Sequence, residues 1–301
     1  MVAGLCVLAS IASARPAAAQ STMAPPTPFV DLVGQWQSHN HEDLMDRGPG
    51  PMLGDFTGLP INVAARQKAE TWDPAVLSQL ERETQPHPPT YAMRGPRPDI
   101  RISEVRDPVS EQLVALSLVG TYGRADRTIW LDGRPHPSEH AEHTWNGFST
   151  GTFHDGELTV VTTHMKMGVI QRIGVPASPY AVMTEHFFRH GLVLTMITMI
   201  DDPIYLEEPM VRSQTWVLNP SQVVWPSAAF EPVDEVAGKA VGWVPHYPLG
   251  AMQTRFADTY HLPLAATLGG KESIYPEYQL KLAQMIAEQK EKDAAAALKK
   301  K

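Results

Sequence analysis

Between residues 99 and 219, apolar and polar residues alternate with a period of about two, which is typical of β-strands. Gly, Pro, Asp and Asn separate the apolar runs and indicate turns between them. The predicted strands are Ile100–Val105, Gln112–Tyr122, Arg127–Leu131, Glu157–Met165, Ala181–Phe188, Leu192–Ile200 and Val211–Leu218, with a short strand before them at Leu32–Gln37. Strands that follow one another through short turns favour antiparallel neighbours.

Both faces of the predicted strand Glu157–Met165 mix apolar with polar side chains, so both faces are expected to be partly covered. We therefore predict a mostly β fold: an antiparallel, lipocalin-like barrel with short peripheral helices, because closure removes exposed strand edges. A two-sheet β-sandwich is the alternative.

The segment before the barrel, residues 20–98, is expected to wrap around it with two short helices. Asn62 is predicted to cap a helix that runs through Trp72. Asp73 and Pro74 have the order of a cap followed by proline, which predicts a second helix. This second helix is expected to end near Glu83.

After residue 219 the pattern predicts loops and helices that pack on the barrel over residues 220–287. One helix is expected near Gln253–Tyr260 and a last one from about Glu277. Residues 288–301 are charged and rich in alanine, with nothing to bury, so we expect a disordered tail.

Charge and the N-terminal pattern limit the partners and suggest a location. The 301-residue chain has a net charge of -8, which makes a nucleic acid an unexpected partner. Residues 2–13 are apolar and small residues follow, which predicts a signal peptide over residues 1–19, cleaved near Ala19. A periplasmic or secreted protein is therefore expected, and this short apolar run predicts no membrane span. Cys6 lies within it, so the mature chain would have no thiol chemistry.

Several motifs are similar to those of a family of uncharacterised secreted bacterial proteins. They are Asp132-Gly-Arg-Pro-His136, His143-Thr-Trp-Asn-Gly-Phe-Ser-Thr-Gly151, Thr184-Glu-His-Phe187 and Asp202-Pro-Ile-Tyr205. The resemblance covers nearly the whole predicted mature chain. It implies secretion and a mostly β fold, and it implies no particular activity.

Three histidines have a spacing that suggests metal binding. On a helix begun at Pro137, His136, His140 and His143 would lie within a narrow arc and could face one divalent ion such as zinc. This arrangement would suit a metal-dependent hydrolase. The alternative is a set of solvated loop histidines, because Pro137 stands where the zinc-protease pattern needs glutamate.

The sequence from Gly147 to Gly151 formally matches the turn that presents a nucleophilic serine, here Ser149. That turn needs a helix after the serine, whereas a strand is expected here. A tight turn between the glycines is therefore favoured, and a serine nucleophile with His164 or His246 as its base is the alternative.

Glu185, His186 and His164 are the candidates for general acid–base catalysis. In a barrel, either Glu185 or its neighbour His186 would point inward, because successive side chains alternate between the two faces. Apolar surroundings move the pKa of a carboxyl or imidazole group toward neutrality, as such catalysis requires. The alternative is that Glu185 forms a structural ion pair with Arg189 or Arg212.

The preferred hypothesis is a lyase, isomerase or hydratase that uses no organic cofactor and acts on a small apolar or aromatic molecule in the barrel. Motifs for nucleotides, flavin, haem c and calcium are absent from the sequence. Arg212, Tyr205, Trp145 and His143 are the predicted substrate-binding residues. The alternatives are a non-catalytic periplasmic small-molecule binding protein and the metal-dependent hydrolase.

Overall fold

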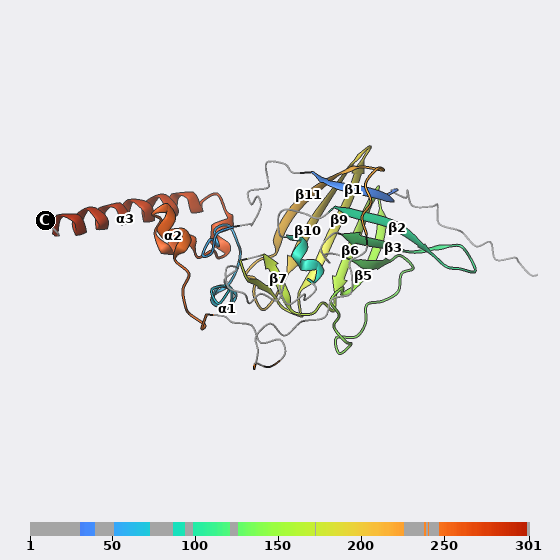
Figure 1. Cartoon of the computed structure of the whole chain (residues 1–301), viewed down its shortest axis with the longest axis horizontal. Helices are drawn as coiled ribbons and strands as arrows, with labels where there is room; N and C mark the ends of the chain where they lie inside the picture. The colour runs from blue at the N-terminus through green and yellow to red at the C-terminus, as the bar shows by residue number, and fades with distance from the viewer. Residues whose placement is uncertain are drawn as a thin grey trace, which may run out of the picture.

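The chain folds into a closed β-barrel. The computed structural model describes residues 31–39, 51–72, 87–93, 99–120, 126–171, 173–225, 238, 240 and 247–299. Within them, nine strands close the barrel in the order β1-β11-β10-β9-β6-β5-β4-β3-β2 (Figure 1). Their bounds are β1 Gly34–His39, β2 Ile100–Arg106, β3 Leu113–Gly120, β4 Arg127–Trp130, β5 Phe148–His154, β6 Glu157–Thr163, β9 Val182–His190, β10 Val193–Asp201 and β11 Met210–Leu218. The predicted barrel is confirmed in preference to the sandwich.

The alternation of side chains decides which residues enter the barrel. On β9, Met183, Glu185 and Phe187 are fully buried, whereas Thr184 and His186 are half-buried on the outer face. Hydrophobic burial explains this choice, because the inward set places two large apolar side chains in the core. The inward set is therefore the one that contains the carboxylate.

One pair of neighbouring strands differs from the antiparallel expectation. β4 and β5 run parallel, with Ile129 opposite Ser149 and Trp130 opposite Thr150. A tight hairpin cannot join parallel neighbours, so residues 131–147 must cross back to the starting end of the barrel. This crossover is irregular and forms no helix from Pro137, which agrees with the alternative of loop histidines, and it carries His136, His140 and His143.

β5 replaces the turn expected between Gly147 and Gly151. Ser149 is buried within it, and its hydroxyl shares a 2.8 Å hydrogen bond with Thr162 on β6. The turn and the nucleophilic serine are both wrong, because this hydroxyl lies inside the barrel. Gly151 serves packing instead: a Cβ there would lie 2.9 Å from Ile129 and 3.0 Å from Leu158.

Two apolar clusters form the core, and a helix and a small sheet close one end of the barrel. The barrel cluster includes Trp36, Leu118, Phe187 and Trp216. The end cluster joins the strand ends to α1 (Val63–Ala69) and to the two-stranded sheet of β7 (Gly168–Gln171) and β8 (Val175–Ala177). η1 (Pro89–Met93) packs against β7.

Local signals predicted the start of α1 and the helix near Tyr260. Asn62 caps α1 as predicted, its side-chain oxygen accepting a 2.9 Å hydrogen bond from the Ala65 amide. α1 ends at Ala69, before Trp72. α2 (Arg255–Tyr260) confirms the helix predicted near Tyr260. The predicted signal peptide, the second helix at Asp73–Glu83 and His246 lie outside the described residues.

The C-terminal helix is longer than expected. η3 (Leu264–Thr267) and η4 (Lys271–Ile274) lead into α3 (Tyr278–Lys299), which has no buried residue and projects away from the barrel (Figure 1). It includes residues 288–299 of the tail expected to be disordered, because alanine, lysine and glutamate have high helix propensity. A 2.9 Å hydrogen bond from Gln289 to Asp293 spans one turn. Among the described helices, none is long and apolar enough to cross a membrane.

Candidate functional site

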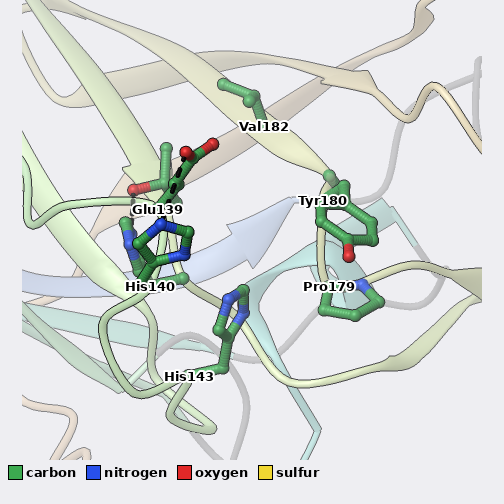
Figure 2. A pocket seen from close by; sticks show the side chains of 9 residues that line it. Glu139, His140, His143, Pro179, Tyr180 and Val182 are labelled. Atoms are coloured by element: carbon green, nitrogen blue, oxygen red, sulfur yellow. Dashed lines mark hydrogen bonds and ion pairs between the residues drawn. The ribbon is translucent and has the colours of Figure 1, made fainter.

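A pocket of about 350 Å³ opens at the barrel end where β6 stops and β9 begins (Figure 2). Three segments far apart in the sequence form its wall: the crossover, the end of β6 and the start of β9. The lining residues are Glu139, His140, His143, Thr163, His164, Pro179, Tyr180, Ala181 and Val182. This volume is at the lower end of the range of small-molecule sites.

His143 is held with one ring nitrogen available. Its Nδ1 lies 2.9 Å from the backbone carbonyl oxygen of Met165. A carbonyl can only accept, so Nδ1 carries a proton, and in the neutral form of the ring the lone pair is on Nε2. Within the described part of the chain, Nε2 makes no hydrogen bond. His143 is therefore oriented as a proton acceptor in the pocket.

A hydrogen-bond relay fixes two other imidazoles, those of His164, which lines the pocket, and of His136. His164 donates from Nε2 to the Ser138 carbonyl oxygen over 2.8 Å, so its Nδ1 accepts from the Thr163 hydroxyl, also at 2.8 Å. Thr163 in turn accepts from Nδ1 of His136 at 2.8 Å, and the Thr150 hydroxyl lies 2.8 Å from Nε2 of His136. Each ring nitrogen of His136 and His164 therefore has a partner.

The backbone at His164 supports this arrangement. Its φ of 56° lies in the left-handed region, which is uncommon for a residue with a side chain. This conformation ends β6 and turns the chain toward the crossover, where Ser138 accepts the hydrogen bond from its ring. The ring centroids of His143 and His164 are 5.2 Å apart, so the relay packs directly against the ring of His143.

Partial burial lowers the pKa of His136, and the neighbouring His164 lowers it further. The unfolded chain therefore binds this proton at a higher pH than the folded protein does. Neutral His136 contributes its full stabilisation to the fold above pH 6.5, the pKa of its side chain in the unfolded chain. This stabilisation is lost as the pH falls from 6.5 toward the lower pKa that His136 has in the folded protein.

We accordingly expect His136→Gln to weaken the acid destabilisation of the protein, because glutamine gains no proton. Urea unfolding at about pH 7.5 and about pH 5.5 measures this change in the free energy of unfolding. The control is His154→Gln, whose side chain is 79% exposed in the native protein and lies outside the relay. The prediction would be contradicted if the native protein and His136→Gln lost the same free energy of unfolding between these two pH values.

The three predicted metal ligands do not converge on one point. Both ring nitrogens of His136 are hydrogen-bonded to threonines, and the side chain of His140 is 88% exposed. Over the residues that the structure describes, no group of three or more His, Cys, Asp or Glu side chains is placed to hold a metal ion. The three side chains do not form the predicted triad because residues 137–143 are not helical. The segment is held against the end of β6 instead, where the Ser138 carbonyl accepts a hydrogen bond from His164 and Thr144 forms a bridge with Met165.

The three predicted acid–base residues are also separated. Glu185 lies inside the barrel, where it forms a hydrogen-bonded ion pair with Arg127, not with Arg189 or Arg212. His186 lies on the outer face and is hydrogen-bonded to Glu157. His164 alone of the three lines the pocket.

Of the predicted substrate-binding residues, only His143 lines the pocket. Arg212 is opposite Thr198 on the neighbouring strand and on the same face as the buried Gln214. Tyr205 packs on the end cluster, with Lys68 Nζ 5.6 Å from its ring centroid. The ring of Trp145 lies 5.3 Å from Lys166 Nζ.

The pocket wall from β9 was not predicted. Figure 2 shows Pro179 and Tyr180 across the pocket from His140. Tyr180 is 68% exposed, although it is large and aromatic. The only sequence signal was Pro179 itself, which marked a turn before β9 and no ligand contact.

Asp202 holds this wall in place. Its buried carboxylate accepts hydrogen bonds from the Ser178 amide at 2.6 Å and the Ser178 hydroxyl at 2.8 Å. It also accepts from the amides of Ile204 at 2.9 Å and Tyr205 at 3.3 Å. The carboxylate therefore joins the turn that carries Tyr180 to the turn after β10.

No protein-family model, curated protein or solved structure matches the chain. The function must therefore be inferred from the side chains of the pocket and of the barrel interior.

Proposed function

We propose that the protein catalyses proton transfer on a small, neutral, largely apolar molecule in the pocket, with His143 as the general base. The reaction class is that of a lyase, isomerase or hydratase without an organic cofactor. The hydrogen bond between His143 Nδ1 and the Met165 carbonyl carries this proposal, because it orients the ring and leaves Nε2 as a proton acceptor.

The two sides of the pocket suggest the kind of substrate. Pro179, Ala181 and Val182 offer an apolar surface, and Tyr180 adds an exposed aromatic ring. The opposite side carries imidazoles. A flat, largely apolar molecule with one polar end fits this division, and Glu139 at the pocket disfavours an anion.

His143 can serve as both base and acid in one reaction. Nε2 removes a proton from a carbon next to a carbonyl group, and the electron pair of the C–H bond moves into the enolate. The imidazolium then returns the proton to a different carbon, which completes an isomerisation, or to a departing hydroxide, which completes a dehydration. The Tyr180 hydroxyl on the other side is a donor for the enolate oxygen.

Deuterium exchange tests this proposal without knowledge of the natural substrate. Small neutral ketones and enones are incubated with the protein in D₂O, and NMR follows deuterium entering the carbon next to the carbonyl. We expect the native protein to accelerate exchange and His143→Gln to slow it by about 10²-fold or more, the usual contribution of a general base. The control His190→Gln changes an exposed histidine at the far end of β9 and should exchange like the native protein.

Exchange that is equally fast in His143→Gln would place the base elsewhere and refute the proposal. Binding of these compounds without any exchange would also refute it. That second result would favour the non-catalytic small-molecule binding protein.

A further inference from the structure

A layer of polar side chains crosses the interior of the barrel. We call it the interior layer; its members Arg127, Ser149, Thr162, Glu185 and Thr198 come from five strands and are each at most 5% exposed. All five side chains point into the barrel, so bulk water does not reach them. Each polar atom therefore needs a partner inside the barrel.

The interior layer separates the two apolar clusters. Along β9, Glu185 lies between Met183 of the end cluster and Phe187 of the barrel cluster. Along β10, Thr198 lies between Ile200 of the end cluster and Met196 of the barrel cluster. The interior layer is thus a band of polar side chains between two apolar clusters. A polar group without a hydrogen-bond partner there raises the free energy of the folded protein.

Most of the layer is hydrogen-bonded internally. Arg127 Nη2 donates to Glu185 Oε2, Arg127 Nη1 lies 3.4 Å from the Thr162 hydroxyl, and Thr162 shares a hydrogen bond with Ser149. Three buried atoms of the layer have no hydrogen-bond partner in the part of the chain that the structure describes. They are Glu185 Oε1, Thr198 Oγ1 and Arg127 Nε.

These three atoms belong to neighbouring side chains. Glu185 and Thr198 are directly opposite each other in the β9–β10 register. Such inward pairs have Cβ atoms about 5 Å apart. Arg127 donates from Nη2 to the carboxylate of Glu185, so its Nε–H belongs to a side chain in contact with the same carboxylate.

The hydrogen-bonding capacities of the three atoms define a complementary group. Glu185 Oε1 accepts, Arg127 Nε–H donates, and the Thr198 hydroxyl can donate. One hydroxyl group on a ligand supplies one donor and two acceptor positions, which matches this set. A cation is disfavoured by the guanidinium of Arg127 and by Arg212, which lies opposite Thr198 on the inner face of β11, and an anion is disfavoured by the carboxylate of Glu185.

We propose that the interior layer binds the hydroxyl group of a small neutral alcohol, separately from the pocket of His143. The hydroxyl donates to Glu185 Oε1 and accepts from Arg127 Nε and Thr198 Oγ1. The apolar part of the molecule lies against an apolar cluster beside the layer. A water molecule would satisfy the three atoms with one donor left over.

Alcohols and their methyl ethers test this proposal, because the ethers keep the oxygen as acceptor and lack the donor. The probes are 1-butanol, cyclohexanol and benzyl alcohol, each paired with its methyl ether, in isothermal titration with the full chain. We expect at least one alcohol to bind about fivefold or more tightly than its ether, as one hydrogen bond predicts. Thr198→Val should weaken binding of that alcohol by about fivefold.

Thr198→Val suits a strand and keeps the size of the side chain, so it should remain folded, which thermal melting checks. The matched control Thr195→Val lies on the outer face of the same strand and should bind the alcohol normally. His143→Gln should also bind it normally, because the two sites are separate.

Three results would overturn the interior site. The first is equal affinity for every alcohol and its ether, and the second is unchanged alcohol binding in folded Thr198→Val. The third is a high-resolution crystal structure, grown with the alcohol, that shows only water at Glu185 Oε1.

Discussion

Replacing Arg127 with leucine is expected to destabilise the folded protein by about 3–5 kcal/mol, the usual cost of removing one member of a buried ion pair. The side chains of Arg127 and Glu185 are 1% and 0% exposed. Without Arg127, the carboxylate would lose the hydrogen bond to Oε2, while Oε1 has no partner in the described protein. Urea unfolding measures the change in the free energy of unfolding.

The double variant Arg127→Leu with Glu185→Leu separates the cost of the unpaired charge from the cost of altered packing. Replacing both members of a buried pair with apolar residues is often nearly neutral, so most of the lost stability should return. Arg134→Leu is the exposed control, because its partner Asp132 lies in a solvated turn. A double variant as unstable as the single one would show that the loss comes from packing instead.

The second large effect is expected at Asp202. Asp202→Ala should lower the free energy of unfolding by about 3 kcal/mol or more, because it removes a buried acceptor and leaves several donors unsatisfied. Those donors are the Ser178 amide and hydroxyl and the amides of Ile204 and Tyr205. Urea unfolding again provides the measurement.

The adjacent residue offers a matched control for this prediction. Asp201 is exposed, so Asp201→Ala should change stability by no more than about 0.5 kcal/mol. Equal stability of the two variants would contradict the role given to Asp202. Because Ser178 begins the turn that carries Tyr180, Asp202→Ala should also weaken ligand binding in the pocket.

The local architecture could be predicted from the sequence because its signals extend over only a few residues. Period-two alternation located eight of the barrel strands, since each strand must place apolar side chains on its inner face. The cap at Asn62 was evident because it contacts Ala65, three residues away. β5 was missed because Gly147 and Gly151 look like turn residues until the neighbouring strands show why Gly151 must be small.

Only the tertiary structure could locate the candidate site. Alternation put Glu185 and His186 on opposite faces without showing which face was inside, and the partner of Glu185 lies 58 residues away in the sequence. The pocket combines the crossover, the end of β6 and the start of β9, which no local pattern relates.

The sequence by itself thus determined eight of the nine barrel strands, the cap of α1 and the mostly β class, because backbone preference and side-chain alternation act between close neighbours. Barrel closure, the parallel β4–β5 pair and the orientation of the His143 ring were decided by contacts between distant segments. Such contacts depend on how the whole chain buries its apolar surface while satisfying its polar groups.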